Sequence, residues 1–356
     1  EGWELLLVSA DGREVQSICR AEGVRHEVIP FVKGVNYVED FISFWLLFQL
    51  IRKERPDVIH SYDSKAGFLG MHAGSLVGIP HRIHSITEMP VHTKDPQKGL
   101  TFLEKWTFSN ATSLWVNSTG MLSFFTSNSG IDADKFKLLG SGSTLGVDLE
   151  KFNRQVLKEN HLVAATMRIL PGENDFIILA IGALTKRKGV EDLIAAFLKS
   201  KIVSRSKLVL IGTFEQEEES LSQETIQTIR EHPRVVQIDW TDHVDHHLAL
   251  ADVLVHPSHE EGFSNVLLEA AAMQVPIICS NCIGNASFIK QQKTGLVFPV
   301  GEVTVLKEAM EFAYVKRDTL ASYTDALFEE VQEKFDRKSM RQLQLDGYRQ
   351  LVRNKD

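Results

Sequence analysis

The chain has 356 residues, which is enough for two domains of ordinary size, and 43% hydrophobic with 24% charged residues is typical of a globular protein. The formal net charge of −8 argues against a nucleic-acid partner, because binding to a phosphate backbone requires a basic surface. The most apolar stretch, residues 41–51, is about half of the roughly 20 residues that a membrane-spanning helix needs. We expect a buried helix there, and any membrane contact to be peripheral.

The chain has three cysteines, at positions 19, 279 and 282. Cys279 and Cys282 have the spacing of a redox or metal pair, but no second pair follows, and a structural zinc site needs four ligands. We therefore expect both cysteines to be structural. Few cysteines and no signal peptide predict a cytoplasmic location.

Short apolar runs, which predict strands, alternate with amphipathic runs, which predict helices. In the first half the expected strands are residues 4–9, 26–31, 57–61, 82–86, 114–117 and 136–139, and the expected helices are 37–54, 65–77, 100–110 and 120–127. In the second half the strands are 176–181, 207–211, 235–238, 252–256 and 275–279, and the helices are 190–199, 219–231, 244–251, 265–273, 285–291 and 303–315. After residue 319 the chain is charged and helical. This alternation predicts an α/β fold with two doubly wound parallel sheets, each binding ligands at the carboxyl ends of its strands.

Residues 256–280 are the most informative segment. A buried strand ends at His256, a loop containing Gly262 follows, and a helix opens at Ser264 or Asn265. A helix N-terminus behind a glycine offers backbone N–H groups that suit a phosphate. Glu261 and Glu269 can accept hydrogen bonds from hydroxyl groups on either side of that phosphate. The pattern predicts a nucleotide-sugar site; the plainer alternative is a helix end with one carboxylate near its dipole and one facing solvent.

The segment from Glu261 to Glu269 resembles the Glu-x7-Glu signature of the retaining family 4 glycosyltransferases, and most closely their capsular and exopolysaccharide branch. The resemblance extends from about residue 57 to about residue 316. It implies the GT-B fold, in which two Rossmann-like domains face a central cleft. The acceptor-side domain would be residues 1–148, the nucleotide-sugar domain 149–329, and the helix of residues 330–356 would return to the first domain.

Two further segments bear on this domain plan. Residues 140–148 resemble the family's linker, with Leu145 in place of an asparagine. Residues 3–9 resemble the family's second strand, so we expect a preceding strand and a glycine-rich loop to be missing from this sequence.

The resemblance also implies roles on the donor side. Glu269 would bind the ribose and Glu261 the donor sugar, with Gly262, Phe263, Ser264 and Asn265 completing the loop. The segment from Gly182 to Gly189 resembles a family loop in which an arginine and a lysine bind the diphosphate. Lys188 matches the lysine, whereas Ala183 replaces the arginine, for which Arg187 or Lys186 would have to substitute. Trp240 resembles a residue near the base.

On the acceptor side, residues 81–92 resemble a family segment with two histidines. His92 matches the second, Thr87 replaces the first, and His84 lies nearby; we predict catalytic roles for His92 and His84 and an acceptor contact for Glu88. His60 and Lys65 lie in a segment resembling one that faces the cleft, where Lys65 could receive an anionic acceptor such as a lipid diphosphate. Ordinary structural roles for the histidines, and helix capping by Asp63 or Ser64, are the alternatives.

The implied function is a hexosyltransferase that moves a sugar from a nucleoside-diphosphate-sugar, most readily a UDP-sugar, to a glycan or a polyprenyl-diphosphate-linked saccharide. The implied location is the cytoplasm, at the inner face of the cytoplasmic membrane. The implied reaction uses no metal or other cofactor and retains the anomeric configuration of the sugar. Asp132 and Asp134, which have the spacing of a metal-binding pair, are expected to cap a turn. A UDP-sugar epimerase of the same fold, or a degenerate protein that only binds sugar nucleotides, is the alternative.

Overall fold

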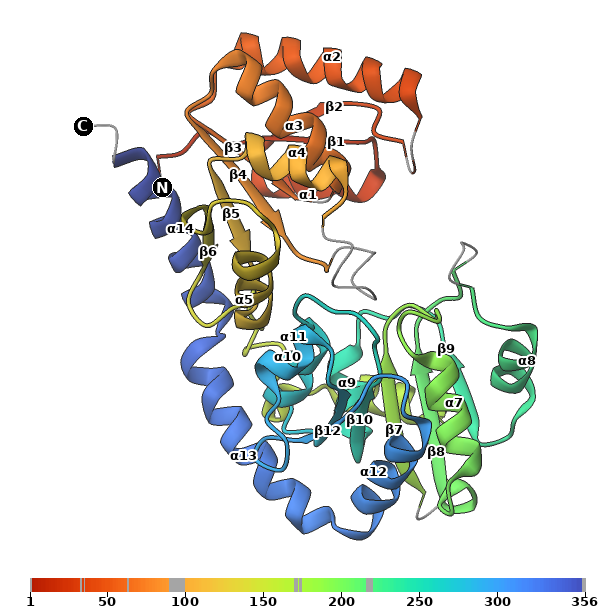
Figure 1. Cartoon of the computed structure of the whole chain (residues 1–356). Coiled ribbons are helices and arrows are strands. Elements are labelled where there is room, and N and C mark those ends of the chain that lie inside the picture. The colour runs from red at the N-terminus through yellow and green to blue at the C-terminus, as the bar shows by residue number, and fades with distance from the viewer. Residues whose placement is uncertain are drawn as a thin grey trace. The chain divides into compact units, whose positions relative to one another are not determined.

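The computed structural model describes residues 2–32, 34, 36–62, 64–89, 100–169, 172, 175–215 and 220–353 (Figure 1). The chain divides into two compact units. Unit 1 comprises Glu1–Val116, Ser123–Lys137 and Asp346–Asp356, and unit 2 comprises Asn117–Leu122 and Leu138–Leu345. Unit 2 thus includes residues 117–122, 138–148 and 330–345, which were expected in the first domain.

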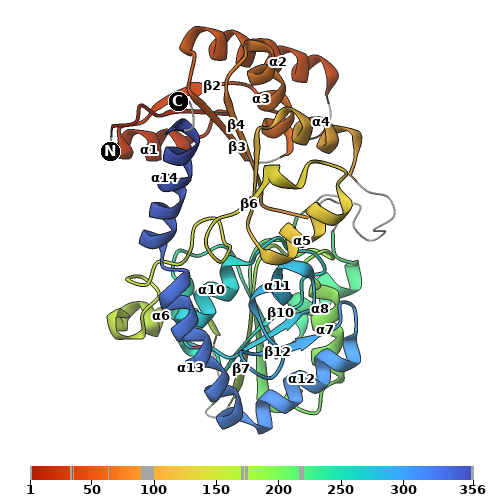
Figure 2. The same ribbon diagram turned by 60° about the vertical axis from the view of Figure 1, so that its left-hand side comes forward.

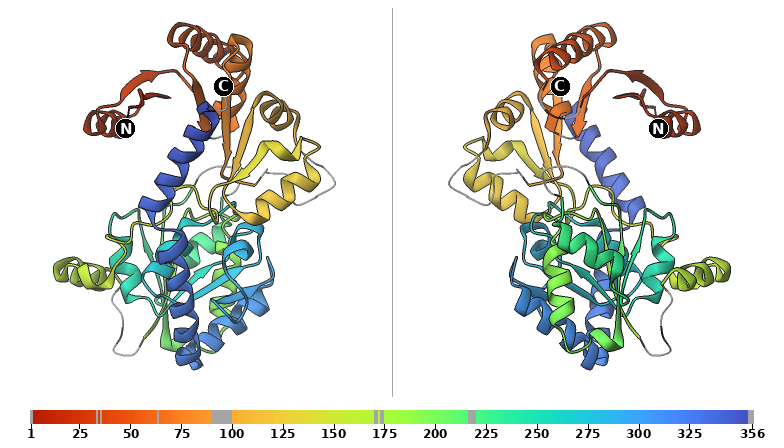
Figure 3. Two further views of the ribbon diagram at one scale, coloured as in Figure 1. Left: turned by 90° about the vertical axis from the view of Figure 1, so that its left-hand side faces the viewer. Right: turned by 90° about the vertical axis from the view of Figure 1, so that its right-hand side faces the viewer.

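Unit 1 contains two sheets. In the smaller, β1 (Leu6–Ser9) pairs in parallel with β2 (Arg25–Val28). The larger has the order β3 (Val58–Tyr62), β4 (His81–Ile86), β5 (Ser113–Val116) and β6 (Phe136–Leu138). The helices are α1 (Arg13–Glu22), α2 (Tyr37–Glu54), α3 (Ser64–Val77), α4 (Phe102–Asn110) and α5 (Thr119–Asn128), the last of which begins in unit 2. Figure 3 shows α1 and the β1–β2 pair at one side of this unit, apart from the larger sheet.

Unit 2 is built on one six-stranded parallel sheet with the order β12-β11-β10-β7-β8-β9. Its strands are β7 (Phe176–Ile181), β8 (Ser206–Ile211), β9 (Val235–Ile238), β10 (Val253–His256), β11 (Ile277–Ser280) and β12 (Leu296–Phe298). The helices are α6 (Glu159–Ile169), α7 (Val190–Lys199), α8 (Gln223–Glu231), α9 (Val244–Leu250), α10 (Asn265–Ala272), α11 (Ile283–Phe288), α12 (Val303–Val315), α13 (Arg317–Lys334) and α14 (Arg337–Arg353), which ends in unit 1.

Alternation along the strands of unit 2 builds two hydrophobic cores, one on each face of the sheet. In β7, Ile177 and Leu179 join a core with α9, α10 and α13, whereas Phe176 and Ile178 join a core with α7, α8 and α12. Successive side chains of a strand point to opposite faces, so an uninterrupted apolar strand is buried on both. The predicted doubly wound parallel architecture is therefore confirmed.

Three elements were not expected from the sequence. They are α1, α6 and β12. Only Cys19 is buried in α1, and only Ala165 and Ile169 are buried in α6, so both helices bury little apolar surface. β12 has only three residues. Figures 2 and 3 show α6 at the periphery of unit 2.

The prediction of a buried helix at residues 41–51 is wrong. Of α2, only Ser43, Leu47 and Ile51 are buried; these residues recur every fourth position and face α3. On its other faces α2 exposes apolar side chains, namely Tyr37 (85%), Val38 (69%), Phe41 (68%), Ile42 (42%), Trp45 (51%) and Leu46 (41%). An apolar run around the whole helix suggested burial, but the contacts of α2 with the other described helices are concentrated on α3. Among the described helices, none combines the length and the apolar composition that a membrane-spanning helix requires.

The cysteine pair and the Asp132–Asp134 turn have the structural roles expected from the sequence. Cys279 and Cys282 are buried free thiols, and Cys279 belongs to the core beside α10. Burial raises the pKa of both thiols. The side chain of Asp132 caps a short 3₁₀ turn by accepting the backbone N–H of Asp134 at 3.1 Å.

Candidate functional site

The candidate site of unit 2 lies where the order of its strands reverses, between β7 and β10. The loop of residues 182–189 follows β7, and the loop of residues 257–264 follows β10. The two loops are joined where the backbone N–H of His259 donates to the carbonyl of Arg187 at 2.8 Å. At such a reversal the connections leave the sheet in opposite directions, and the carboxyl ends of the two strands then form a ligand site.

Glycine allows the two loops to approach this closely. Gly189 has φ +70°, and a Cβ atom there would lie 2.1 Å from the carbonyl oxygen of Pro257. No side chain fits at that distance, and non-glycine residues rarely adopt this backbone conformation. Gly189 therefore fixes the position of Lys188 against the β10 loop.

Lys188 and Glu261 form an ion pair across the two loops, with Nζ 2.5 Å from Oε1. His256, the last residue of β10, places its Nε2 at 3.3 Å from the same oxygen. His256 Nε2 makes no hydrogen bond of good geometry among the described residues, so this second contact is defined by its distance alone. The structure thus brings together the predicted Lys188 and Glu261, and adds His256, which the sequence analysis did not select.

Glu261 is ionised at physiological pH. Burial by itself would raise its pKa, but the contacts with His256 and Lys188 outweigh burial and lower the pKa to about 2. A carboxylate in this state accepts hydrogen bonds and cannot donate a proton. Its chemistry fits binding of a sugar hydroxyl.

The N-terminus of α10 is open. Ser264 is the N-cap, yet its side chain makes no capping hydrogen bond and is buried. The first N–H groups of a helix have no partner within the helix, so these donors and the positive end of the dipole are available to an anion. Gly262 is buried and Asn265 is exposed. The Phe263 ring packs against Phe288 and Phe335, with centroids 5.5 and 5.6 Å away, so only its backbone can contact a donor.

Glu269 lies in the second turn of α10 and is half-buried. Within the described residues, its carboxylate takes part in no hydrogen bond or ion pair. Burial raises its pKa to about 7, although the charges of Lys151 and Arg337 act in the opposite direction. Its electrostatic neighbours differ from those of Glu261.

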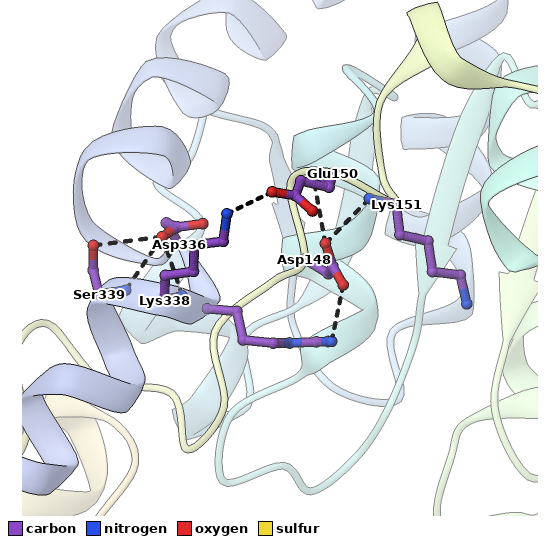
Figure 4. A network of polar contacts seen from close by, with 7 residues as sticks. Asp148, Glu150, Lys151, Asp336, Lys338 and Ser339 are labelled. Carbon is purple, nitrogen blue, oxygen red and sulfur yellow. Dashed lines mark hydrogen bonds and ion pairs between the residues drawn. The ribbon is translucent and has the colours of Figure 1, made fainter. Parts of the chain in front are cut away.

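A polar network holds Lys151 and Arg337 in unit 2 (Figure 4). The Asp148 carboxylate accepts the backbone N–H of Lys151 at 3.1 Å and pairs with the Arg337 guanidinium at 3.2 Å. Lys338 pairs with Glu150 at 2.5 Å. Backbone hydrogen bonds also link Val147 to Phe335 and Arg337. The segment that resembles the family's linker is therefore fixed to the junction of α13 and α14, and two cations are placed near Glu269.

The remaining donor-side residues are less closely placed. Ala183 lines a small pocket together with Gly182, Lys188 and His256, and its methyl group leaves open the position that an arginine would occupy. Arg187 contributes its carbonyl to the link between the loops. Trp240 follows the edge strand β9 and is 73% exposed. A ligand contact of Trp240 stays a prediction.

In unit 1 the predicted acceptor-side histidines have structural partners. His60 Nδ1 lies 2.5 Å from the Tyr348 hydroxyl, and Nε2 lies 2.8 Å from Ser85 Oγ. Burial lowers the pKa of His60 to about 3, so the ring is neutral. His84 is 5% exposed, bonds Ser61 at 2.9 Å, and fills the space left by Gly67, where a Cβ atom would lie 2.5 Å from its ring. His84 is thus a packed residue of the core of unit 1, and its catalytic role stays a prediction.

Lys65 is also committed to the fold. Its ammonium group donates to the carbonyls of Val32 and Gly34 at 2.6 and 2.5 Å and to Asp40 at 2.6 Å. These three contacts attach Lys65 to the start of α2, and its predicted role as receptor of an anionic acceptor stays a prediction. Glu88 is exposed at the end of the β4 segment. His92 lies outside the described residues.

The comparison with known proteins supports the same family along the chain. Residues 1–142 match the model of the glycosyl transferase 4-like domain, and residues 167–326 match that of the glycosyl transferases group 1. The capsular polysaccharide biosynthesis glycosyltransferase CapM of Staphylococcus aureus is 29% identical over 310 residues, which cover 86% of this chain and 79% of CapM. The chain belongs to glycosyltransferase family 4, in the capsular and exopolysaccharide branch.

Two further similarities agree with this family 4 assignment. An Escherichia coli UDP-Gal:alpha-D-GlcNAc-diphosphoundecaprenol alpha-1,3-galactosyltransferase is 24% identical over 84% of this chain and 80% of its own length. A crystal structure of HepE from Anabaena in complex with UDP and glucose has a TM-score of 0.81 at 16% identity, covering 96% of this chain and 91% of that one. The structural likeness shows that the two parallel α/β units of this family 4 glycosyltransferase have the GT-B fold.

Proposed function

We propose that this glycosyltransferase transfers a hexose from a UDP-sugar to a hydroxyl group of a lipid-linked saccharide, with retention of anomeric configuration. The observation that carries the proposal is the arrangement around α10. An ionised carboxylate paired with a lysine precedes an uncapped helix N-terminus, and a second carboxylate, in the second turn of that helix, makes no hydrogen bond or ion pair within the described residues. A sugar, a diphosphate and a ribose match these three features in order.

The chemistry asked of unit 2 is charge stabilisation. When the bond between the sugar and the diphosphate breaks, negative charge develops on the leaving nucleoside diphosphate. Lys188 and the N–H groups of α10 are already in place before this charge appears, and one such pre-placed donor contributes about 3–4 kcal/mol. Because Lys188 is held by Glu261 in the free protein, the diphosphate would share this lysine with the carboxylate.

Retention and the choice of UDP are supported by similarity. The Glu261–Glu269 signature resembles that of the retaining enzymes of the family. The E. coli relative is described as using UDP-Gal, and the HepE structure contains UDP. With two positive groups serving the diphosphate, we propose that transfer needs no metal ion. Transfer in the presence of excess EDTA at more than half the untreated rate supports this point, and loss of transfer that Mg²⁺ or Mn²⁺ restores contradicts it.

A lipid-linked acceptor is supported by the diphosphoundecaprenol substrate in the E. coli relative's name and by α2 of this chain. Aromatic side chains exposed on α2, among them Phe41 and Trp45, suit the boundary between the headgroups and acyl chains of a bilayer. Exposed Arg52, Lys53 and Arg55 at the end of α2 add attraction to anionic lipid. We therefore assign peripheral membrane contact to this helix.

Sugar-nucleotide binding is the first experiment. A thermal-shift panel of UDP-, GDP- and ADP-sugars should show the largest stabilisation with a UDP-sugar, because stabilisation follows ligand occupancy. The stabilising donor is then incubated with polyprenyl-diphosphate-linked saccharides, and NMR of the product gives the anomeric configuration. Conversion of the UDP-sugar without acceptor would identify an epimerase. Binding without turnover under any acceptor would identify a protein that only binds.

Membrane contact is tested separately by co-sedimentation with phosphatidylglycerol vesicles. A Phe41→Ser, Trp45→Ser double variant should lose vesicle binding and keep UDP binding. Val315→Ser serves as the control, because Val315 is also exposed (69%) but lies on α12 of unit 2. Equal vesicle binding by all three proteins would contradict the assignment of α2.

A further inference from the structure

Three histidines of unit 2 gather where α6 meets the start of α9. His161 lies in the first turn of α6, His243 is the N-cap of α9, and His246 follows three residues later on the same helix. One ligating ring nitrogen of each lies within 4.8 Å of those of the other two. Ring centroids are 4.1 Å apart for His161 and His243, 5.3 Å for His161 and His246, and 5.6 Å for His243 and His246.

The orientation of His246 is fixed by a carboxylate. Its Nδ1 lies 2.9 Å from Asp245 Oδ1, and its Nε2 accepts the backbone N–H of Lys158 at 3.2 Å. The Nδ1–H therefore donates to Asp245, and the lone pair is on Nε2. Asp245 and His246 are both buried. A carboxylate that orients a histidine in this way is the usual support of a metal-binding imidazole.

Helix capping explains only part of this arrangement. The bond from Lys158 to His246 satisfies an N–H group at the start of α6, but it gives no role to the other two rings. Within the described part of the chain, the ring nitrogens of His161 and His243 make no hydrogen bond. Two imidazoles without polar partners thus lie beside a third that is oriented by an aspartate.

We propose that His161, His243 and His246 bind a divalent transition-metal ion, zinc by ligand preference, and that the ion clamps α6 to α9. Imidazole nitrogen is a preferred ligand of zinc, and nitrogens at 2.0–2.1 Å in a tetrahedral site lie about 3.3 Å from one another. The three nitrogens must therefore approach by at most about 1.5 Å, which rotation of the exposed His243 and the half-buried His161 can supply. Solvent completes the fourth position, so the proposed site is an open three-histidine site and differs from the closed four-ligand site considered for the cysteines.

The charges near the cluster oppose one another. The positive charge of Lys158 disfavours a bound cation, whereas the negative charge of Asp245 favours one. A metal ion at His246 Nε2 would replace the backbone N–H of Lys158 and leave the hydrogen bond between His246 Nδ1 and Asp245 in place. The clamp also meets a structural need, because α6 buries only Ala165 and Ile169 and lies at the periphery of unit 2 (Figure 3). The proposal is independent of the sugar-nucleotide site and of the reaction.

The test is metal binding by the untagged full chain after treatment with EDTA and dialysis. Calorimetry with zinc sulfate should show one ion per chain, and Co²⁺ should give the visible absorption of a tetrahedral site. His161→Gln and His243→Gln should each weaken zinc binding at least about 100-fold, since loss of a merely supporting group already costs 10- to 100-fold. His232→Gln, which changes a histidine of unit 2 outside the cluster, should bind zinc like the unchanged protein.

Hydrogen exchange tests the clamp itself. Zinc should slow exchange of the α6 amides in the unchanged chain and leave them unaffected in His161→Gln. Absence of zinc binding by the unchanged protein, or equal binding by the unchanged protein and both ligand variants, would overturn the proposal. Tight zinc binding without protection of α6 would overturn the clamp.

Discussion

Replacing Glu269 by glutamine should stabilise the free protein at alkaline pH and weaken its binding of the donor. Burial raises the pKa of Glu269 from 4.5 to about 7. One pKa unit corresponds to about 1.4 kcal/mol, so the ionised carboxylate costs about 3 kcal/mol of folding free energy, less the solvent screening of a half-buried group. We expect a net cost of about 2–3 kcal/mol.

The sign depends on which state holds the proton. Between pH 4.5 and 7 the folded protein keeps a proton on Glu269 that the unfolded chain has released, so stability falls as the pH rises through this window. Above pH 7 the cost is constant. Glu269→Gln should therefore raise the free energy of unfolding by about 2–3 kcal/mol at pH 8 and by about 1 kcal/mol or less at pH 5. Urea unfolding at the two pH values measures how the effect of the substitution on the free energy of unfolding differs between pH 8 and pH 5. Any effect of the substitution that does not depend on pH cancels in this difference.

The same variant should bind UDP less well. A hydrogen bond from a ribose hydroxyl to a charged carboxylate contributes about 1.5–3 kcal/mol, or about 10- to 150-fold in affinity. Calorimetry with UDP at pH 8 measures this loss. Glu308→Gln, on the exposed face of α12, is the control and should change neither property. An equal effect of Glu269→Gln on stability at both pH values would refute the burial argument, and unchanged UDP affinity would refute the ribose assignment.

Three other substitutions test the remaining parts of the reasoning. Lys188→Ala should lower the rate of transfer by about 10²–10³-fold, whereas Lys186→Ala should keep it within about threefold. Similar losses of rate in the two variants would contradict the role of Lys188 in stabilising the leaving diphosphate. Gly189→Ala should lower the free energy of unfolding by at least about 2 kcal/mol and weaken UDP binding, because the added Cβ would overlap the carbonyl of Pro257. The control Gly301→Ala, at φ +80° with no atom within 4 Å of the added Cβ, should lower the free energy of unfolding by about 1 kcal/mol. Equal losses in the two variants would mean that the loops move apart to accommodate the Cβ atom. Below pH 6.5 the unfolded chain binds a proton at His60 that the folded protein does not, so stability falls as the pH falls. Between pH 7 and 5 the unchanged protein should therefore lose about 1–2 kcal/mol more of its free energy of unfolding than His60→Gln. An equal loss in the two proteins, measured by urea unfolding, would contradict the low pKa.

The sequence by itself determined the architecture and the donor loops. Strands such as Phe176–Ile181 are apolar without interruption, which forces burial on both faces, and the pattern of strand, glycine loop and helix around Gly262 has few other meanings. Lys188 and Glu261 were identified separately, as parts of two motifs more than 70 residues apart. Their pairing at 2.5 Å follows from the strand order, which puts the ends of β7 and β10 side by side. His256 could have been selected by the same rule, since it ends a strand at the reversal.

Tertiary structure decided every role that depends on what surrounds a side chain. His60, His84 and Lys65 have residue types suited to a site, and only the tertiary structure shows their contacts with the Tyr348 hydroxyl, Gly67 and the carbonyls of Val32 and Gly34. The exposure of α2 has the same origin, because hydropathy records the composition of a helix and not the number of its neighbours. The histidine cluster joins α9 to a helix that periodicity did not predict. Residue type and spacing set what a side chain is able to do, whereas burial and partners are fixed by contacts between segments distant in the chain.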